Sequence, residues 1–143
     1  MNLFKYRTPC CNYSPIFLRL ALGAIMIMHG YDKLFVTGPE GVAVFFDNLS
    51  IPIPLINAWF ISLLEFGGGI AIVLGLFTRV LSLLFAGDMF VAFVTVHAKN
   101  GFFVKEGGYE FVMIIFAVAL ALACLGAGKY SLDRLLLPRV QKN

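Results

Sequence analysis

Residues 55–77 have the sequence LINAWFISLLEFGGGIAIVLGLF, an apolar stretch with one ionisable residue, Glu65. A helix needs about 20 mostly apolar residues to cross a bilayer, because each residue rises about 1.5 Å through a hydrocarbon core near 30 Å thick. This stretch therefore predicts a transmembrane helix. Only Thr78 and Arg79 separate it from the next apolar stretch, which continues to Val96. A connection this short makes the two predicted helices antiparallel neighbours.

Two further stretches, 15–35 and 108–125, have the length and composition of membrane spans. The whole chain is 60% hydrophobic and only 13% charged, whereas soluble proteins are roughly 45 to 50% apolar and about 25% charged. A 15.8 kDa soluble domain could not enclose so much apolar surface. We therefore predict an all-α, integral membrane four-helix bundle over residues 15–128, between a cytoplasmic segment 1–14 and a basic cytoplasmic tail 129–143.

The connections on either side of the central pair are longer. Residues 41–49 are apolar enough to form a short helix at the membrane interface, with a re-entrant segment as the alternative. Residues 96–107 are polar with an aromatic pair, and we expect a structured loop there, at the interface opposite Arg79. The first apolar stretch contains Arg19 and has no small-residue cleavage site, so it is interpreted as a retained helix and not as a signal peptide.

The distribution of basic residues predicts the orientation, because Lys and Arg near helix ends stay on the cytoplasmic side. With the amino terminus inside, seven basic residues are cytoplasmic and three, including the borderline Lys33, are external. Both termini are therefore predicted to be cytoplasmic. The inside set is Lys5, Arg7, Arg79, Lys129, Arg134, Arg139 and Lys142, and the other external residues are Lys99 and Lys105.

Ionisable residues lie inside the predicted spans, where each costs about 2.5 to 3.5 kcal/mol on insertion scales unless it faces protein or water. In the first span Arg19, His29 and Lys33 fall on one helix face, which they share with small and apolar residues at spacings of 3 or 4. That face must point into the bundle. The small residues Gly67, Ala71 and Gly75 form a ridge that would let another helix approach closely, and a homodimer is one option.

The ionisable groups of the four spans lie at similar depths, which favours a shared polar cavity over isolated pairs. We predict that it binds a quinone or another small polar ligand and relays protons. In the alternative interpretation these residues form neutralising pairs, such as Lys33 with Glu65 or Glu110, that only lock the bundle. The candidate catalytic residues are Glu65, His29 and Glu110, and the candidate ligand-binding residues are Arg19, Lys33, His97, Tyr109 and Asp88.

Several other chemistries receive less support. Nitrogen and oxygen ligands of His29, His97, Glu65 and Glu110 would suit zinc, iron or manganese, but no short ligand motif is present and no metal site is assigned. The three cysteines form no C-x-x-C pair, although the adjacent Cys10 and Cys11 leave a redox or lipidation site open. Basic residues form no tract, so nucleic-acid binding is not expected.

Seven short motifs follow one another along the chain: Leu18-Arg19-Leu20, His29-Gly30-Tyr31-Asp32-Lys33-Leu34, Glu65-Phe66-Gly67-Gly68-Gly69, Leu74-Gly75-Leu76-Phe77-Thr78-Arg79, His97 to Phe103, Gly107-Gly108-Tyr109-Glu110 and Gly126-Ala127-Gly128-Lys129-Tyr130-Ser131-Leu132-Asp133. In their order and spacing these motifs resemble the DoxX family of small four-helix membrane proteins, over about residues 18–135. Asp88 departs from the pattern, since the resemblance implies an uncharged residue there.

The resemblance implies an inner-membrane protein associated with oxidoreductase systems, since relatives include a subunit of thiosulfate:quinone oxidoreductase and proteins linked to oxidative-stress defence. A catalytic activity of this chain alone does not follow from it. Without a dithiol or a haem or flavin motif, electrons would have to come from a partner or a substrate. Two other functions stay open: a transporter or channel for a small solute or ion, and a noncatalytic scaffold that anchors soluble redox enzymes.

Overall fold

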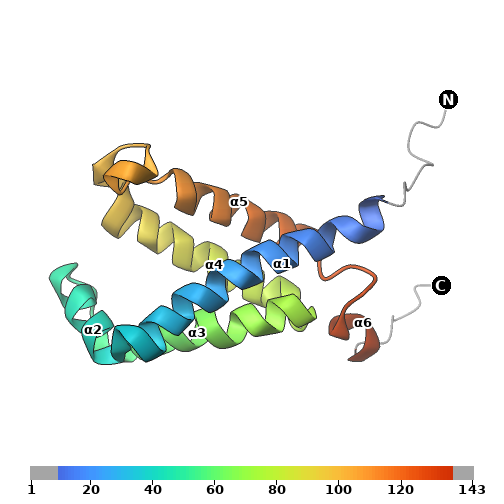
Figure 1. The fold of residues 1–143 in the computed structure, drawn as a ribbon, viewed down its shortest axis with the longest axis horizontal. Coiled ribbons are helices and arrows are strands. Elements are labelled where there is room, and N and C mark those ends of the chain that lie inside the picture. Colours follow the sequence, from blue (N-terminus) through green and yellow to red (C-terminus); the bar gives the residue numbers. More distant parts are fainter. Residues whose placement is uncertain (1–9, 137–143) are drawn as a thin grey trace.

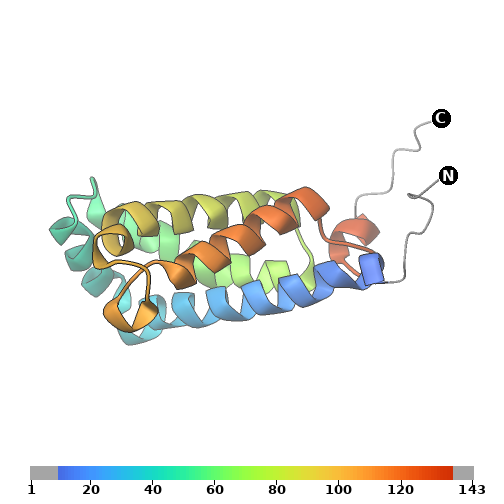
Figure 2. The same ribbon diagram turned by 90° about the horizontal axis from the view of Figure 1, so that it is seen from above.

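The computed structural model describes residues 10–136, with the side chains of residues 13–136, and within that range all regular structure is helical. Four long helices run side by side along the length of the molecule (Figures 1 and 2), as the prediction of an all-α bundle requires. They are α1 Cys10–Tyr31, α3 Pro54–Leu74, α4 Thr78–Ala92 and α5 Glu110–Leu125, and the short helices are α2 Gly38–Asn48 and α6 Leu132–Leu136.

The bundle has the dimensions and surface of a membrane protein. Three segments of the described chain, Tyr13–Val36, Pro54–Leu74 and Thr78–Asn100, are long and apolar enough to cross a bilayer. The outside of the bundle is apolar too: Phe17 is 70% exposed and Ile56 65%. In water such a surface would aggregate, whereas in a bilayer it contacts lipid chains.

The fourth long helix, α5, is shorter than the other spans, with 16 residues. At about 1.5 Å a residue it rises about 24 Å, less than the core of a bilayer near 30 Å thick. Non-helical backbone at membrane depth is tolerated where protein covers it. The connections at both ends of α5 meet this condition, because Gly108 on one side and Gly126 and Ala127 on the other are buried.

Three predicted boundaries are corrected by the structure. Helix α1 begins at Cys10, so Pro15 lies inside the helix and not at its first turn. The turn between α3 and α4 is Gly75 to Phe77, and Thr78 and Arg79 belong to α4. Gly75 has φ of 73° and so ends α3 in the left-handed conformation that glycine adopts without strain.

The predicted interfacial helix is confirmed as a helix, α2, which packs on α3.

The helices pack as two pairs, α1 with α3 and α4 with α5. Glycines bring α1 and α3 together: a Cβ added at Gly30 would lie 2.2 Å from the backbone nitrogen of Phe66, and one at Gly69 would lie 2.8 Å from that of Ile27. The predicted ridge is therefore not the contact between these helices. Its first member, Gly67, is exposed and has nothing within 4 Å of its Cβ position, because it faces away from α1.

One end of the bundle is closed by Arg19, and we call it the Arg19 end. The Arg19 side chain, 4% exposed, donates four hydrogen bonds of 2.6 to 2.9 Å to backbone carbonyls. Two acceptors belong to the last turn of α3 and two to the segment after α5. A buried cation at the carboxyl end of a helix meets both its free carbonyls and its dipole. The acceptors are the carbonyls of Ile72, Val73, Ala127 and Tyr130.

The same segment after α5 also caps α4. The carboxylate of Asp133 accepts hydrogen bonds from the backbone nitrogens of Phe77 and Thr78, at 2.7 and 3.0 Å. An acidic side chain satisfies the free N–H groups at the start of a helix. Nearby, the rings of Tyr13 and Tyr130 stack with centroids 5.6 Å apart. The first and last described helices, α1 and α6, therefore start and finish at the same end of the molecule (Figure 1).

At the opposite end, α1 and α4 each finish in one turn of π-helix, Asp32–Val36 and Phe93–His97. A π turn inserts one extra residue into a helix and often accompanies a functional site. Between the two ends lies an apolar core, in which Phe85, Met26 and Leu122 are fully buried. This core separates Arg19 from the π turns.

Candidate functional site

A cavity of about 930 Å³ lies at the end of the bundle with the π turns. Its walls are mostly apolar and come from all four long helices, the two π turns and α2. Cavities of roughly 300 to 1,000 Å³ with apolar walls and a few converging polar groups are typical of small-molecule sites. Five of the predicted site residues line it: His29, Lys33, Glu65, Asp88 and His97.

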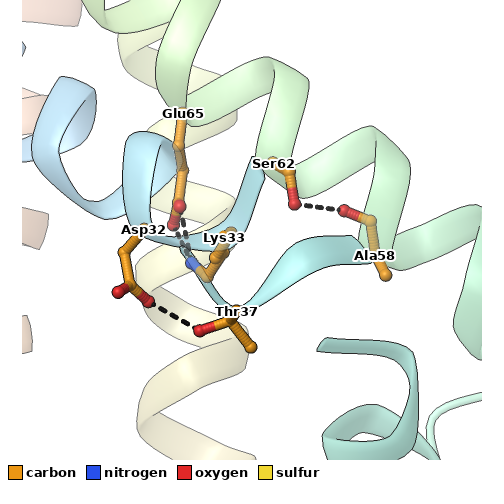
Figure 3. Close-up of polar contacts among 6 residues, drawn as sticks. All are labelled: Asp32, Lys33, Thr37, Ala58, Ser62 and Glu65. Carbon is orange, nitrogen blue, oxygen red and sulfur yellow. Dashed lines mark hydrogen bonds and ion pairs between the residues drawn. The ribbon is translucent and has the colours of Figure 1, made fainter. Parts of the chain in front are cut away.

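Two of the lining residues, Lys33 and Glu65, form an ion pair. Figure 3 shows this pair between the π turn and α3. The Lys33 ammonium donates to both Glu65 carboxylate oxygens at 2.5 Å. The side chain of Glu65 is 2% exposed and that of Lys33 is 26% exposed. Of the two partners that the sequence left open for Lys33, the structure selects Glu65. A neutralised pair makes a charged carboxylate tolerable in the apolar interior.

The π turn Asp32–Val36 forms because the backbone nitrogen of Thr37 donates to the carbonyl of Asp32 at 2.8 Å, one residue further along than in an α-helix. The hydroxyl of Thr37 also donates to the Asp32 carboxylate at 3.1 Å (Figure 3). Lys33 is the second residue of this turn. The turn therefore sets the direction from which the ammonium approaches Glu65 on α3.

Asp88, from the middle of α4, lines the same cavity and forms no ion pair with any residue that the structure describes. Its Oδ2 atom is closed to water and has no hydrogen-bond partner among those residues. Burying a polar atom without a partner costs free energy. The rest of the side chain reaches the cavity, where a carboxylate can accept a hydrogen bond.

The two histidines lie at different parts of the cavity. His29 packs against the ring of Phe111 on α5, with the ring centroids 6.2 Å apart. His97, in the π turn that follows α4, has its Nδ1 atom 2.7 Å from the carbonyl of Gly107. That contact fixes the His97 ring against the loop. The His29 ring makes no hydrogen bond with any residue that the structure describes, so its nitrogens are available to a ligand.

Three predicted site residues lie outside the cavity. Arg19 is at the other end of the bundle, with its guanidinium bound to carbonyls. Tyr109 packs edge to face on Phe93 and Phe102, with ring centroids 5.3 and 5.5 Å away. Glu110 begins α5, where its carboxylate accepts a 2.6 Å hydrogen bond from the backbone nitrogen of Val104. The structure thus separates these residues from Glu65 and His29.

Sequence reasoning missed part of the lining. Thr37, Asn57 and Thr95 add polar groups to the cavity wall, and each is an uncharged residue in or beside a predicted span. Asn57 donates to the carbonyl of Pro52 at 2.6 Å, and Thr95 to that of Val91 at 2.8 Å. Polar residues near the end of a span are too common to have indicated a site.

In residues 10–136, no three His, Cys, Asp or Glu side chains lie close enough together to hold a metal ion. The cavity residues His29, Glu65, Asp88 and His97 belong to three helices and a π turn, and no three of them lie close enough together to share a metal ion. Cys124 is free and exposed. The side chains of Cys10 and Cys11 lie outside the described part of the chain, as do Lys5, Arg7, Arg139 and Lys142 of the predicted cytoplasmic set.

Apolar helices that enclose a charged pair and a deep pocket define a small polytopic membrane protein with a polar site between its spans. The chain belongs to the DoxX family, whose model matches residues 14–98.

Two relatives have descriptive names. "Putative oxidoreductase CatD" of Bacillus subtilis (strain 168) is 34% identical over 118 residues, which cover 82% of this chain and 83% of the relative. "Inner membrane protein YqjF" of Escherichia coli (strain K12) is 32% identical over 121 residues, with 82% and 88% covered.

A third relative, named only "Uncharacterized protein", comes from Haemophilus influenzae and is 30% identical over 140 residues, covering 92% of this chain and 94% of the relative. No solved structure matches the chain at a significant level.

Proposed function

We propose that the chain is the membrane component of an oxidoreductase or redox-stress system, and that its cavity binds a quinone or a similar small polar ligand. The observation that supports this best is the cavity of about 930 Å³ with apolar walls and the Lys33–Glu65 ion pair. A quinone fits this combination, because its ring is apolar and its carbonyls accept hydrogen bonds. The name of the Bacillus subtilis relative agrees with a redox role.

Reduction of a quinone to a quinol adds two electrons and two protons. In our proposal a partner protein or a soluble substrate supplies the electrons, since the chain has no C-x-x-C motif. Glu65 and His29 would handle the protons, because a carboxylate and an imidazole exchange protons readily. Lys33 would hold Glu65 in place and donate a hydrogen bond to a quinone carbonyl. Glu110 and Arg19 have no part in this step.

The proposed location is the inner membrane, which agrees with the name of the Escherichia coli relative. We further propose that the Arg19 end faces the cytoplasm, as the excess of basic residues predicts. The cavity would then lie in the outer half of the bilayer. The domain limits predicted at residues 14 and 128 and the option of a homodimer remain proposals of the same kind.

Electron transfer in proteoliposomes tests the proposed function. The chain would be reconstituted with a benzoquinone and thiosulfate, one electron donor that the family resemblance suggests, together with a membrane extract from its host as the source of partners. We expect quinol formation with wild type and a loss of at least tenfold with Glu65→Gln. The matched control is Glu106→Gln, the same substitution at an exposed residue outside the cavity.

Equal rates for wild type and Glu65→Gln would reject the site. Flux of a solute into the proteoliposomes without redox turnover would favour the transporter alternative. That alternative would require the packed core around Phe85 and Leu122 to open, since both are 0% exposed. Co-purification of redox enzymes that survives substitution of every charged cavity residue would favour the scaffold.

A further inference from the structure

The mouth of the cavity lies among side chains of the membrane-spanning helices. Leu83, Leu84 and Val91 of α4 line it while being 58, 43 and 50% exposed, and Phe60 of α3 lines it at 53%. These residues belong both to the cavity wall and to the lipid-facing surface. The cavity therefore opens sideways, toward the hydrocarbon, between α3 and α4.

The helix pairing explains this opening. Helices α3 and α4 are consecutive and joined by the turn at Gly75 to Phe77, but α3 packs mainly on α1 and α4 mainly on α5. Away from the turn α3 and α4 diverge, and α2, which packs on α3, contributes Phe45 and Phe46 to the cavity.

A ligand that enters from lipid must be neutral or shielded, because a charged group costs about 2.5 to 3.5 kcal/mol at the centre of a membrane span. Inside, it meets the ion pair of Lys33 with Glu65 and the carboxyl group of Asp88, which lines the cavity and forms no ion pair with any residue that the structure describes. A carboxylate accepts hydrogen bonds, so the group that matches it is a hydrogen-bond donor. A neutral hydroxyl group satisfies both conditions.

We propose that the cavity binds an amphiphilic phenol or quinol from the bilayer, with a ring hydroxyl donating to Asp88 and the hydrocarbon tail leaving between α3 and α4 past Leu83. The inference rests on the proposed function and makes it more specific, because it selects the reduced, lipid-soluble form of the ligand and its path of entry.

Equilibrium binding to the full chain in lipid nanodiscs tests the hydroxyl contact, with empty nanodiscs measuring partition into lipid. The probes are a decyl-benzoquinol, kept under argon, its dimethyl ether, which has no O–H, and the decyl-benzoquinone. Wild type should bind the quinol at least tenfold more tightly than the ether or the quinone, as expected for a hydrogen bond to a carboxylate. Asp88→Leu should abolish that preference.

The Asp88→Leu variant suits this purpose, since replacing a buried polar atom without a partner by an apolar side chain should not unfold the bundle. The path of the tail is tested with Leu83→Trp at the mouth. This variant should bind the decyl compounds about tenfold more weakly than wild type does, and its affinity for a tail-less benzoquinol should change much less. Leu120→Trp is the matched control, because Leu120 of α5 is 39% exposed and does not line the cavity.

The outcomes separate the two proposals. Binding of decyl-benzoquinone that depends on Lys33 and Glu65 but is the same in wild type and Asp88→Leu would overturn this inference and leave the proposed function standing. A preference for the quinone would also overturn it, since Asp88 would then be a donor. If none of the probes binds wild type, both proposals fail.

Discussion

At the scale of single residues, the two ends of the bundle use charge differently. Arg19 is satisfied by carbonyl oxygens and serves the framework, whereas Lys33 is satisfied by another side chain in the wall of a cavity. Both interactions stabilise a cation inside an apolar bundle. Only the second leaves its groups within reach of a ligand.

Removing one member of the Lys33–Glu65 pair should have unequal effects. Lys33→Met leaves an almost fully buried carboxylate without its partner and should lower the free energy of unfolding by about 3 kcal/mol. Glu65→Gln should lower it less, because Lys33 is 26% exposed and can reach water. Unfolding in mixed detergent micelles measures both. In the double variant Lys33→Met with Glu65→Leu, the free energy of unfolding should return to within about 1 kcal/mol of wild type. Equal losses of stability in the two single variants would contradict the unequal burial of the two side chains.

Arg19→Lys should destabilise the bundle by about 2 kcal/mol, although it keeps the charge. A lysine cannot make the four directed hydrogen bonds of the guanidinium, and hydrogen bonds to charged groups are worth about 1.5 to 3 kcal/mol each. The same detergent unfolding experiment checks it. Arg79→Lys, at an exposed arginine of the same end with one 3.4 Å contact, is the control and should change stability by less than about 0.5 kcal/mol.

At the scale of helices, the long spans and the inward face of α1 could be predicted from the sequence, because length, hydropathy and a helical period of charged and small residues are local properties. Arg19, Gly23, Met26 and Gly30 are all buried, as that period indicates. The partners of these residues could not be predicted. The ridge at Gly67, Ala71 and Gly75 has the spacing expected of a contact between helices. In the structure, however, α3 is oriented so that Gly69 faces α1 and Gly67 faces away.

Part of the cavity lining could be predicted in the same way. Glu65, Lys33 and His29 share a cavity because their depths along two neighbouring spans, α3 and α1 with its π turn, match. The sequence places Glu110 at a depth similar to that of Glu65. In the structure the Glu110 carboxylate accepts a hydrogen bond from the backbone of Val104, in the loop before α5, and does not line the cavity. The π turns at Asp32 and Phe93 have no mark in the sequence, since they depend on which carbonyl a backbone nitrogen finds after packing.

Two glycine substitutions should act in opposite directions. Gly30→Ala places a Cβ 2.2 Å from the backbone nitrogen of Phe66, so α1 and α3 must separate, at a cost of about 2 kcal/mol. Gly67→Ala, in the middle of α3 and facing open space, should stabilise the protein by roughly 0.5 to 1 kcal/mol through helix propensity. Thermal unfolding of both variants in the same detergent measures the difference. A loss of stability with Gly67→Ala would show that this face packs against another copy of the chain.

At the scale of the whole molecule, the two ends should lie on opposite sides of the membrane, with the Arg19 end inside. The test uses single cysteines in a chain whose Cys10, Cys11 and Cys124 are replaced by serine. An impermeant maleimide should label Lys99→Cys in intact spheroplasts and Lys129→Cys only after lysis. Both positions are exposed, which makes them a matched pair. The reverse pattern would invert the proposed orientation and place the cavity in the cytoplasmic half.

The bonds of Arg19 also impose an order on biosynthesis. Its acceptors lie 53 to 111 residues further along the chain, so the ribosome synthesises Arg19 before any of them. Until the segment around Tyr130 has been made, the nascent first span lacks part of the carbonyls that bind its guanidinium. Chains truncated before that segment would expose an unsatisfied guanidinium, a mark by which membrane proteases could recognise them.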